Sequence, residues 1–295
     1  MFHILCFLSP TDLLRLAATS SNFRNYWTEN PLLWHSSSIH KGFISKEQAL
    51  NVTSLFDSSW RTFYFTYMPQ AVPAEFIEFC EKCKLGRFGE ITCIHKFGLI
   101  GPSKCGKSEY ARYFSNPTNY SFQEEYLMTI GLEFCIQSIS FSQDNMEQCC
   151  KIEVWDTAGD QRFRSITQSY YRGLFSIGFC FDMSSKESFN EMKSIFFQYL
   201  KDRLSIDITK MNPQKAYQTI HDSLNVNHNL CIIGLKKEIR QVSTFDIQQF
   251  LNTIIDPHIP FMKRKVAYFE QSVHSKDHLF YPFMFGMMNK LMQHR

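Results

Sequence analysis

The sequence predicts an α/β fold, a doubly wound and mostly parallel sheet, preceded by a small α-helical region. Two observations predict the sheet. Apolar runs such as 91–100, 177–183 and 230–234 alternate with helical patterns, and the first of them leads through a glycine-rich loop into a helix. The third observation is a pair of helix signals near the N-terminus. In a chain of 295 residues we predict three parts: a helical region with its flank at 1–68, a linker and helix at 69–90, and the sheet domain at 91–295.

Composition and charge argue against several classes of protein. The formal net charge of +3 is too small to indicate nucleic acid or a membrane surface as a partner. No apolar run of about eighteen residues predicts a transmembrane helix, and the N-terminus lacks the basic lead and cleavage site of a signal peptide. Among scattered cysteines, Cys93, Cys180 and Cys231 lie within apolar runs, as buried thiols of a reducing compartment do. We therefore expect a soluble cytoplasmic protein.

Two short helices are predicted within the first 35 residues. Ser9 suits an N-cap, Pro10 the first helical position, and Asp12 the first turn, where a negative charge favours the helix dipole. An apolar stripe follows at 13–17. A second helix opens near Ser20 and ends before the next proline.

This order of elements, closed by Leu32-Leu33-Trp34, resembles the F-box. Residues 59–64 (SWRTFY) are similar to a segment that often follows an F-box, whereas the family's leading Leu-Pro-x-Glu is absent. The resemblance implies that residues 2–34 dock on a Skp-type adaptor and thereby on a cullin ubiquitin ligase. The alternative is a helical cap that packs on residues 60–79.

The stretch 68–73 (MPQAVP) indicates a linker, and a helix over 74–85 is predicted to follow it. This helix carries one pair of possible zinc ligands, and the next strand carries a second pair. Buried or incidental thiols are the favoured interpretation, because the two pairs belong to different secondary structures. The four side chains concerned are Cys80, Cys83, Cys93 and His95.

The strongest local pattern is G-x-x-x-x-G-K-S, between a predicted strand over 91–100 and a predicted helix over 108–114. The backbone N–H groups of such a loop and the helix N-terminus offer unpaired donors and a positive dipole to a phosphate chain. Lys107 is predicted to reach the terminal phosphates and Ser108 to ligate Mg²⁺. The candidate phosphate-binding residues are Gly101, Ser103, Lys104, Cys105, Gly106, Lys107 and Ser108.

Two downstream segments extend this pattern. Residues 126–134 (YLMTIGLEF) and 155–173 (WDTAGDQRFRSITQSYYRG) resemble the first switch and the Asp-x-x-Gly region of Ras-like small GTPases, in their Rab form. The resemblance implies a P-loop GTPase fold with its ligand at the carboxyl ends of the strands. It also implies GTP or GDP with Mg²⁺ as cofactors, and an effector or substrate protein bound at the switch regions.

The same resemblance implies roles for single residues. Ser108, Thr129 and Asp156 are expected to hold Mg²⁺. The N–H of Gly159 is expected to face the γ-phosphate, and Phe122 to lie against the edge of the guanine base.

Several positions depart from the family's pattern. Asp160 stands where the family has the glutamine that orients the attacking water, and Gln161 lies one residue out of register. We therefore expect hydrolysis to be weak or absent. Leu235, Lys236 and Glu238 stand for the guanine-reading Asn-Lys-x-Asp, of which only the lysine is unchanged.

The remaining segments are less specific. The family's last guanine-reading box, Ser-Ala-Lys, appears here in altered form over 270–274 (EQSVH), and Ser272 and Val273 are its candidate nucleotide contacts. Strands over 134–142 and 149–155 are predicted to form a hairpin. An insertion over 202–229 is a surface excursion or a partner site, and a Phe- and Met-rich helix over 278–293 belongs to the core or forms a partner groove. The family's prenylated terminal cysteines are missing, so we expect no lipid anchor.

Three functions remain open at this point. The favoured one is a Rab-like GTP-binding protein with Mg²⁺-dependent nucleotide binding and weak or absent hydrolysis, fused to an F-box-like head. The alternatives are a pseudo-GTPase scaffold and a substrate-recruiting adaptor of a cullin ubiquitin ligase. The intact phosphate-loop and Mg²⁺ positions favour nucleotide binding, whereas Asp160 and Leu235 argue against fast turnover and tight base selection.

Overall fold

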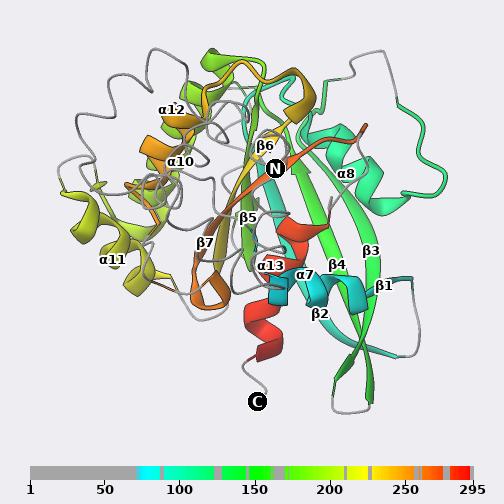
Figure 1. The fold of residues 1–295 in the computed structure, drawn as a ribbon. Helices are drawn as coiled ribbons and strands as arrows, with labels where there is room; N and C mark the ends of the chain where they lie inside the picture. The colour runs from blue at the N-terminus through cyan, green and yellow to red at the C-terminus, as the bar shows by residue number, and fades with distance from the viewer. Residues whose placement is uncertain are drawn as a thin grey trace, which may run out of the picture. The chain divides into compact units, whose positions relative to one another are not determined.

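The structure is a computed structural model (Figure 1). Its contacts divide the chain into two units, each described here by itself. One unit comprises residues 1–71 and 243–252, and the other comprises 72–242 and 253–295. The F-box-like head predicted over 2–34 lies outside the described residues. These are 72, 74–86, 90–122, 128–143, 146–160, 162, 170–171, 173–208, 211–224, 228–255, 259, 261–274 and 280–292.

Helices and strands alternate through most of the described chain. In the first unit, α12 (Thr244–Leu251) begins at Ser243, whose hydroxyl accepts a hydrogen bond from the N–H of Asp246. The elements of the second unit are α7 (Ala74–Lys82), β1 (Lys84–Leu85), β2 (Ile91–Ile100), α8 (Lys107–Ser115), β3 (Leu132–Gln143), β4 (Met146–Thr157), β5 (Ser176–Asp182), α10 (Lys186–Leu204), α11 (Pro213–Ser223), β6 (Asn229–Leu235), β7 (Val266–Gln271) and α13 (Tyr281–Met292), with short 3₁₀ turns at Lys237–Ile239 and Phe261–Lys263.

The described strands form one sheet in the order β1-β3-β4-β2-β5-β6-β7 (Figure 1). The pairs β4-β2, β2-β5, β5-β6 and β6-β7 are parallel, whereas β1-β3 and β3-β4 are antiparallel. The direction of winding reverses between β2 and β5, because the chain goes first to one side of β2 and then to the other. In open α/β sheets ligands bind in the crevice at the carboxyl ends of such strands.

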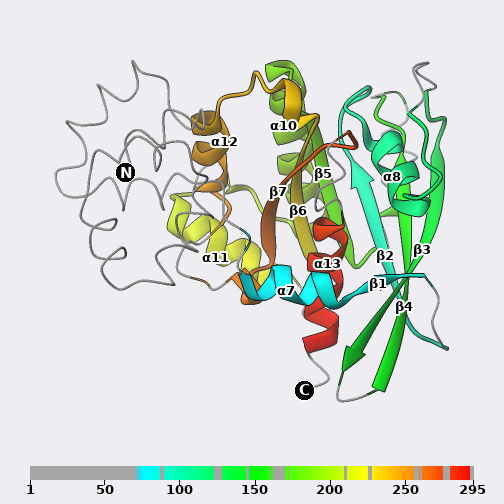
Figure 2. The ribbon, with the colours of Figure 1, turned by 45° about the vertical axis from the view of Figure 1, so that its right-hand side comes forward.

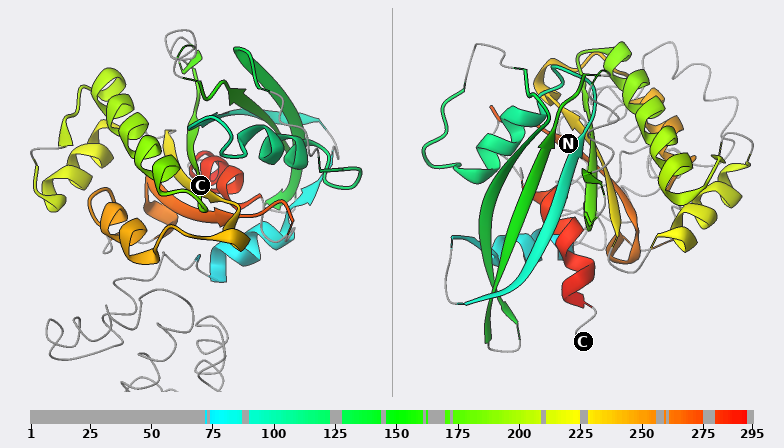
Figure 3. Two further views of the ribbon diagram at one scale, coloured as in Figure 1. Left: turned by 90° about the horizontal axis from the view of Figure 1, so that it is seen from above. Right: turned by 180° about the vertical axis from the view of Figure 1, so that it is seen from behind.

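Helices pack on both faces of the sheet, as the predicted doubly wound fold requires (Figure 3). On one face α10 packs on β5, where the ring of Phe196 lies 5.0 Å from that of Phe179. On the other face α13 packs on the central strands, and its Phe283 contacts Phe97 of β2 and Tyr110 of α8. The predicted Phe- and Met-rich C-terminal helix therefore supplies core, and its described range is Tyr281–Met292.

The segment before β2 differs from the prediction of one helix over 74–85. Helix α7 ends at Lys82, and the next residues pair with the edge of β3 as β1 (Figure 2). The N–H of Gly86 donates to the carbonyl of Ser138 at 2.8 Å, which fixes this pairing. The chain leaves the helix because the edge of β3 offers backbone partners that a helix end lacks.

Helix α7 packs on the core of the second unit. Its Phe76 is fully buried, and the ring meets those of Phe261 at 5.3 Å and Tyr281 at 5.5 Å, both edge to face. The division of the chain at residue 91 stays a prediction.

Two further expectations meet the structure. The hairpin strands β3 and β4 are longer than the predicted 134–142 and 149–155.

No group of three or more His, Cys, Asp or Glu side chains among the described residues is placed to hold a metal ion, so the zinc alternative is wrong there. His95 instead lies buried, 3.0 Å from the hydroxyl of Ser176. No helix in the described part of the chain is both long and apolar enough to cross a bilayer.

Candidate functional site

The glycine-rich loop connects the end of β2 to the start of α8, as the sequence predicts. A Cβ on Gly101 would lie 2.2 Å from the carbonyl oxygen of Cys180, so a larger residue does not fit there. Gly106 has φ = +105° and directly precedes the helix, a conformation that glycine adopts without strain. The loop is thus shaped by two positions that require glycine.

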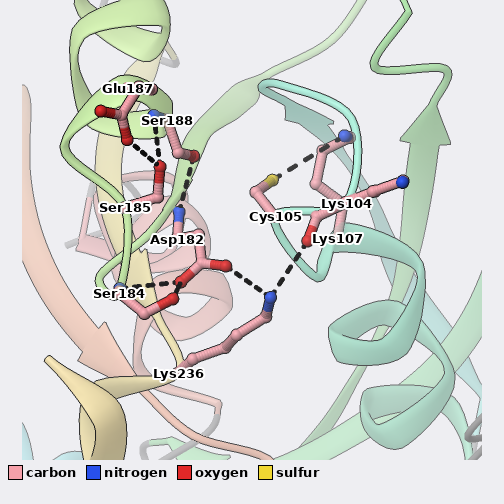
Figure 4. A network of polar contacts seen from close by, with 9 residues as sticks. All are labelled: Lys104, Cys105, Lys107, Asp182, Ser184, Ser185, Glu187, Ser188 and Lys236. Atoms are coloured by element: carbon pink, nitrogen blue, oxygen red, sulfur yellow. Dashed lines mark hydrogen bonds and ion pairs between the residues drawn. The ribbon is translucent and has the colours of Figure 1, made fainter.

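Lys107 folds back over this loop. Its Nζ donates hydrogen bonds to the carbonyls of Gly101 and Pro102, at 3.0 and 2.9 Å, and the residue is 5% exposed. The same Nζ lies 3.9 Å from the sulfur of Cys105, which is buried beneath the loop (Figure 4). The ammonium group is therefore held at the mouth of the loop, where the predicted phosphate chain would lie.

Gly159, after the end of β4, is packed against the same loop. A Cβ at this position would lie 2.6 Å from the backbone nitrogen of Ser103 and 2.7 Å from Nζ of Lys107. Both are groups that bind phosphate in such loops. The fit leaves no room for a side chain, so the backbone of Gly159 shares one space with the candidate phosphate-binding residues.

Ser108, Thr129 and Asp156 come together from three separate segments. The hydroxyls of Ser108 and Thr129 are 2.9 Å apart, and the Thr129 hydroxyl donates to Oδ2 of Asp156 at 3.3 Å. Oδ1 of Asp156 is buried and has no hydrogen-bond partner in the part of the chain that the structure describes. Burial raises the pKa of this carboxyl, against the opposing influence of the Lys107 charge and of hydrogen bonds from Ser108 and Thr129.

These three side chains fit a magnesium ion. Magnesium prefers oxygen ligands and is commonly held by one or two carboxylates together with phosphate and water oxygens. A buried carboxylate oxygen without a partner is costly unless a cation or a donor satisfies it. The donor set of two hydroxyls and the Asp156 carboxylate is chemically suited to Mg²⁺, and the assignment of these residues as metal ligands stays a prediction.

A lysine joins the end of β6 to the phosphate loop (Figure 4). Nζ of Lys236 donates to Oδ2 of Asp182, at the end of β5, and to the backbone carbonyl of Lys104 at 3.1 Å. Oδ1 of Asp182 accepts from the N–H and the hydroxyl of Ser184 at 2.8 and 2.6 Å. The side chain of Lys236 thereby connects the ends of β5 and β6 to the loop that follows β2.

Both lysines of this link have left-handed backbone conformations, with φ of +63° at Lys104 and +59° at Lys236. Such a conformation costs a residue with a side chain roughly 1–2 kcal/mol. Strain of this kind persists where surrounding contacts over-determine it, and it concentrates at functional sites.

At the other end of the site, Phe122 and His274 face each other. Their ring centroids are 5.0 Å apart, and Phe122 is 50% exposed. The N–H of His274 donates to the hydroxyl of Ser272 at 3.1 Å, which fixes the turn after β7. Leu235 is 3% exposed, and it lies near Gly106. This end of the site, where a guanine base is expected, thus carries the apolar side chains of Phe122 and Leu235.

Most of these segments contribute residues to the wall of one cavity of about 500 Å³. Of the side chains predicted from sequence, the cavity is lined by Ser103, Lys104, Gly106, Lys107, Ser108, Phe122, Thr129, Gly159, Leu235, Lys236, Glu238 and Val273. Four other predicted residues are buried and do not line the cavity. Each of them is next to a lining residue in the sequence or hydrogen-bonded to one; they are Gly101, Cys105, Asp156 and Ser272.

Other lining residues were not among the predicted contacts. They are Glu109, Arg112, Thr157 and Ile239, together with Gln271 and His274 of the predicted last guanine-reading box.

Asp160 does not line this cavity; its carboxylate is engaged by Arg162. The guanidinium donates from Nη2 to Oδ2 at 2.7 Å and from Nε to both oxygens at 3.1 Å, and the Arg162 N–H donates to Oδ1 at 2.9 Å. These bonds lower the pKa of Asp160 to about 2. Asp160 is thus ionised and already has a cationic partner. The second predicted catalytic residue, Gln161, lies outside the described residues.

Comparison with known proteins gives two family matches. A model of the Ras family matches residues 96–284, and a model of the F-box domain matches residues 1–35. The first match spans more than half of the chain and includes all the predicted residues of the site.

Individual relatives match a shorter part. The Ras-related protein RABD2a of Arabidopsis thaliana is 42% identical over 104 residues, which are 35% of this chain and 48% of that protein. The Ras-related protein RIC1 of Oryza sativa subsp. japonica is 41% identical over the same length and the same shares. The GTP-binding protein YPTM1 of Zea mays is 38% identical over 104 residues, 35% of this chain and 47% of its own. The chain spans about half the length of these relatives.

Proposed function

Because this chain belongs to the Ras family, we propose that it is a Rab-like protein that binds guanine nucleotide with Mg²⁺ and hydrolyses GTP weakly or not at all. One observation carries the proposal. A single cavity of about 500 Å³ is lined by the glycine-rich loop, by the hydroxyl-bearing Ser108 and Thr129, and by the apolar side chains of Phe122, Leu235 and Val273. A cavity of this size is typical of sites for small molecules and cofactors.

Different residues bind the phosphates, the metal ion and the base of the nucleotide. The backbone N–H groups of the loop and Lys107 bind the phosphates, since both are donors with positive charge or dipole. Ser108, Thr129 and Asp156 would hold Mg²⁺, which would neutralise part of the negative charge of the phosphates. Phe122 and the stem of Lys236 border the base.

Weak hydrolysis follows from the side chain at 160. Glutamine at this place orients the attacking water with an amide. Asp160 has no donor when ionised, and its two oxygens already accept from Arg162. The ion pair also reduces the repulsion between this carboxylate and a γ-phosphate, so nucleotide binding is compatible with Asp160 even though water positioning is lost.

The experiment that tests nucleotide binding is the substitution Lys107→Ala. Titration with a fluorescent guanine nucleotide in Mg²⁺ should show binding to the wild type and none to the variant, while circular dichroism shows an unchanged fold. Lys201→Ala, on the exposed surface of α10, is the matched control and should bind like the wild type. Equal affinity of Lys107→Ala and wild type would contradict the assignment of the loop.

A second candidate function rests on the F-box match at residues 1–35. F-box domains bind Skp-type adaptors, and we propose that the head does so here and links the Ras-family domain to a cullin ubiquitin ligase as a substrate-recruiting adaptor. The full chain should be captured by an immobilised Skp-type adaptor. The variant Leu13→Asp, Leu16→Asp, which places charges in the apolar stripe, should not be captured. Failure of the wild-type chain to bind would favour the pseudo-GTPase scaffold or a helical cap instead.

A further inference from the structure

Gln271, the last residue of β7, is a buried polar side chain at the wall of the nucleotide cavity. It is 2% exposed and lines the cavity beside Val273 and His274. Its Oε1 atom has no hydrogen-bond partner among the residues that the structure describes. A buried amide oxygen without a donor costs free energy, unless a bound molecule supplies the missing N–H group.

The position of Gln271 in the sheet explains why an amide belongs there. In the parallel register of β6 and β7, Leu235 is paired with Gln271. Leu235 is the residue that stands for the guanine-reading asparagine, and its side chain makes no hydrogen bond. Strand β7 therefore carries an amide side chain directly beside the position where β6 has Leu235 in place of the family's asparagine.

The neighbouring polar residue of β7 is committed elsewhere. Glu270 forms an ion pair with Arg240, and its carboxylate accepts a hydrogen bond from the hydroxyl of Tyr268 at 2.9 Å. Alternation along the strand directs residues 270 and 271 to opposite faces. Of these two residues, only Gln271 lines the cavity. The carboxylate of Glu238 lies in the same wall and is a second hydrogen-bond acceptor there.

We propose that Gln271 is a specificity-determining residue that contacts the base. Its amide oxygen accepts a hydrogen bond from an N–H group of the bound guanine, and it thereby supplies from β7 a polar contact that Leu235 cannot supply from β6. This inference rests on the proposed nucleotide binding. Guanine offers N–H groups at N1 and N2, which suit a site edge with two acceptors, Glu238 and Gln271.

The test compares a ligand with a base and one without it. GTP and ribose 5′-triphosphate are titrated in Mg²⁺ into the full-length wild type and into Gln271→Met, which keeps an unbranched side chain of similar length without the amide. The variant should bind GTP roughly tenfold more weakly, the effect of one lost hydrogen bond, and should bind ribose 5′-triphosphate like the wild type. Gln198→Met, on α10, is the control and should change neither affinity.

A rescue variant separates a base contact from a structural role. Adding Leu235→Asn to Gln271→Met returns an amide to the same level of the sheet, and it should recover part of the lost GTP affinity. Equal GTP affinity of Gln271→Met and wild type would overturn the inference, and so would an equal loss for both ligands. Failure of the wild type to bind either triphosphate would instead overturn the proposed function and this inference with it.

Discussion

Asparagine at position 156 should have opposite effects on the empty and on the loaded protein. In the structure Asp156 is 1% exposed, and one of its oxygens has no partner among the described residues. Burial raises its pKa although Lys107 attracts the charge, so the cost of burial exceeds the gain from attraction. Without Mg²⁺, the ionised carboxylate therefore destabilises the fold. This is the expected condition of a site built to receive a cation.

The magnitude follows from the difference between a charged and a neutral buried group. An unsatisfied neutral group costs about 1–3 kcal/mol and a charged one more, and part of the difference is offset by the lost attraction to Lys107. We expect Asp156→Asn to raise the free energy of unfolding of the metal-free protein by roughly 1–2 kcal/mol. For a domain of this size that corresponds to an increase of roughly 2–8 °C in Tm.

With Mg²⁺ and GTP bound, the wild type should be more stable than Asp156→Asn. A ligand at about 100 times its Kd stabilises the folded state by about 2.7 kcal/mol, and the variant should lose this gain because it lacks the metal-binding charge. Thermal denaturation in EDTA and in Mg²⁺–GTP measures both effects. Glu153→Gln is the control, since it makes the same change on the same strand and its side chain pairs with Lys151 outside the cavity.

The dependence on pH has a definite sign. A carboxyl with a raised folded-state pKa binds its proton more tightly in the folded than in the unfolded chain. The metal-free wild type should therefore lose stability as pH rises from the ordinary pKa of an aspartate through the raised one. The advantage of Asp156→Asn is fully present above that interval. A variant that is less stable than the wild type in EDTA at neutral pH would refute this reasoning.

Three other substitutions test the rest of the site. Asp160→Gln should accelerate GTP hydrolysis measured in a single turnover, and an unchanged rate would show that another group is limiting. Leu235→Asn with Glu238→Asp should raise the ratio of GTP to ATP affinity by roughly tenfold or more, measured by titration calorimetry; an unchanged ratio would mean that these positions do not read the base. Gly159→Ala should weaken binding of Mg²⁺–GTP, because its Cβ would lie 2.6 Å from the nitrogen of Ser103, and wild-type affinity would contradict the packing described above.

The fold was predictable because its signals are local. The strand over 91–100 matches β2 at both ends, since a glycine-rich loop bounds it on one side. Strands β5 and β6 are buried on both faces and read as continuous apolar runs, which is typical of parallel sheets covered by helices. The phosphate-loop residues were predictable for the same reason, because they are consecutive in the chain.

Features that depend on a distant partner were not predictable in the same way. The two residues of β1 have no strand signal, and they are extended because the edge of β3 pairs with them. The ion pair of Asp160 with Arg162 requires a particular loop conformation that spacing alone does not reveal. The burial of Gln271 follows from its register with Leu235 on the neighbouring strand.

Strand β1 also covers part of one edge of the sheet, opposite Ile139 and Ser140 of β3. A strand at the edge of a sheet presents unpaired N–H and C=O groups to other chains, and without β1 more of the edge of β3 would do so. A fragment that begins at residue 91 would expose this edge and remove Phe76 from between Phe261 and Tyr281. Losing a buried phenylalanine side chain typically costs about 3–5 kcal/mol. The Ras-family part of the chain should thus self-associate more strongly when cut at residue 91 than when cut before residue 72.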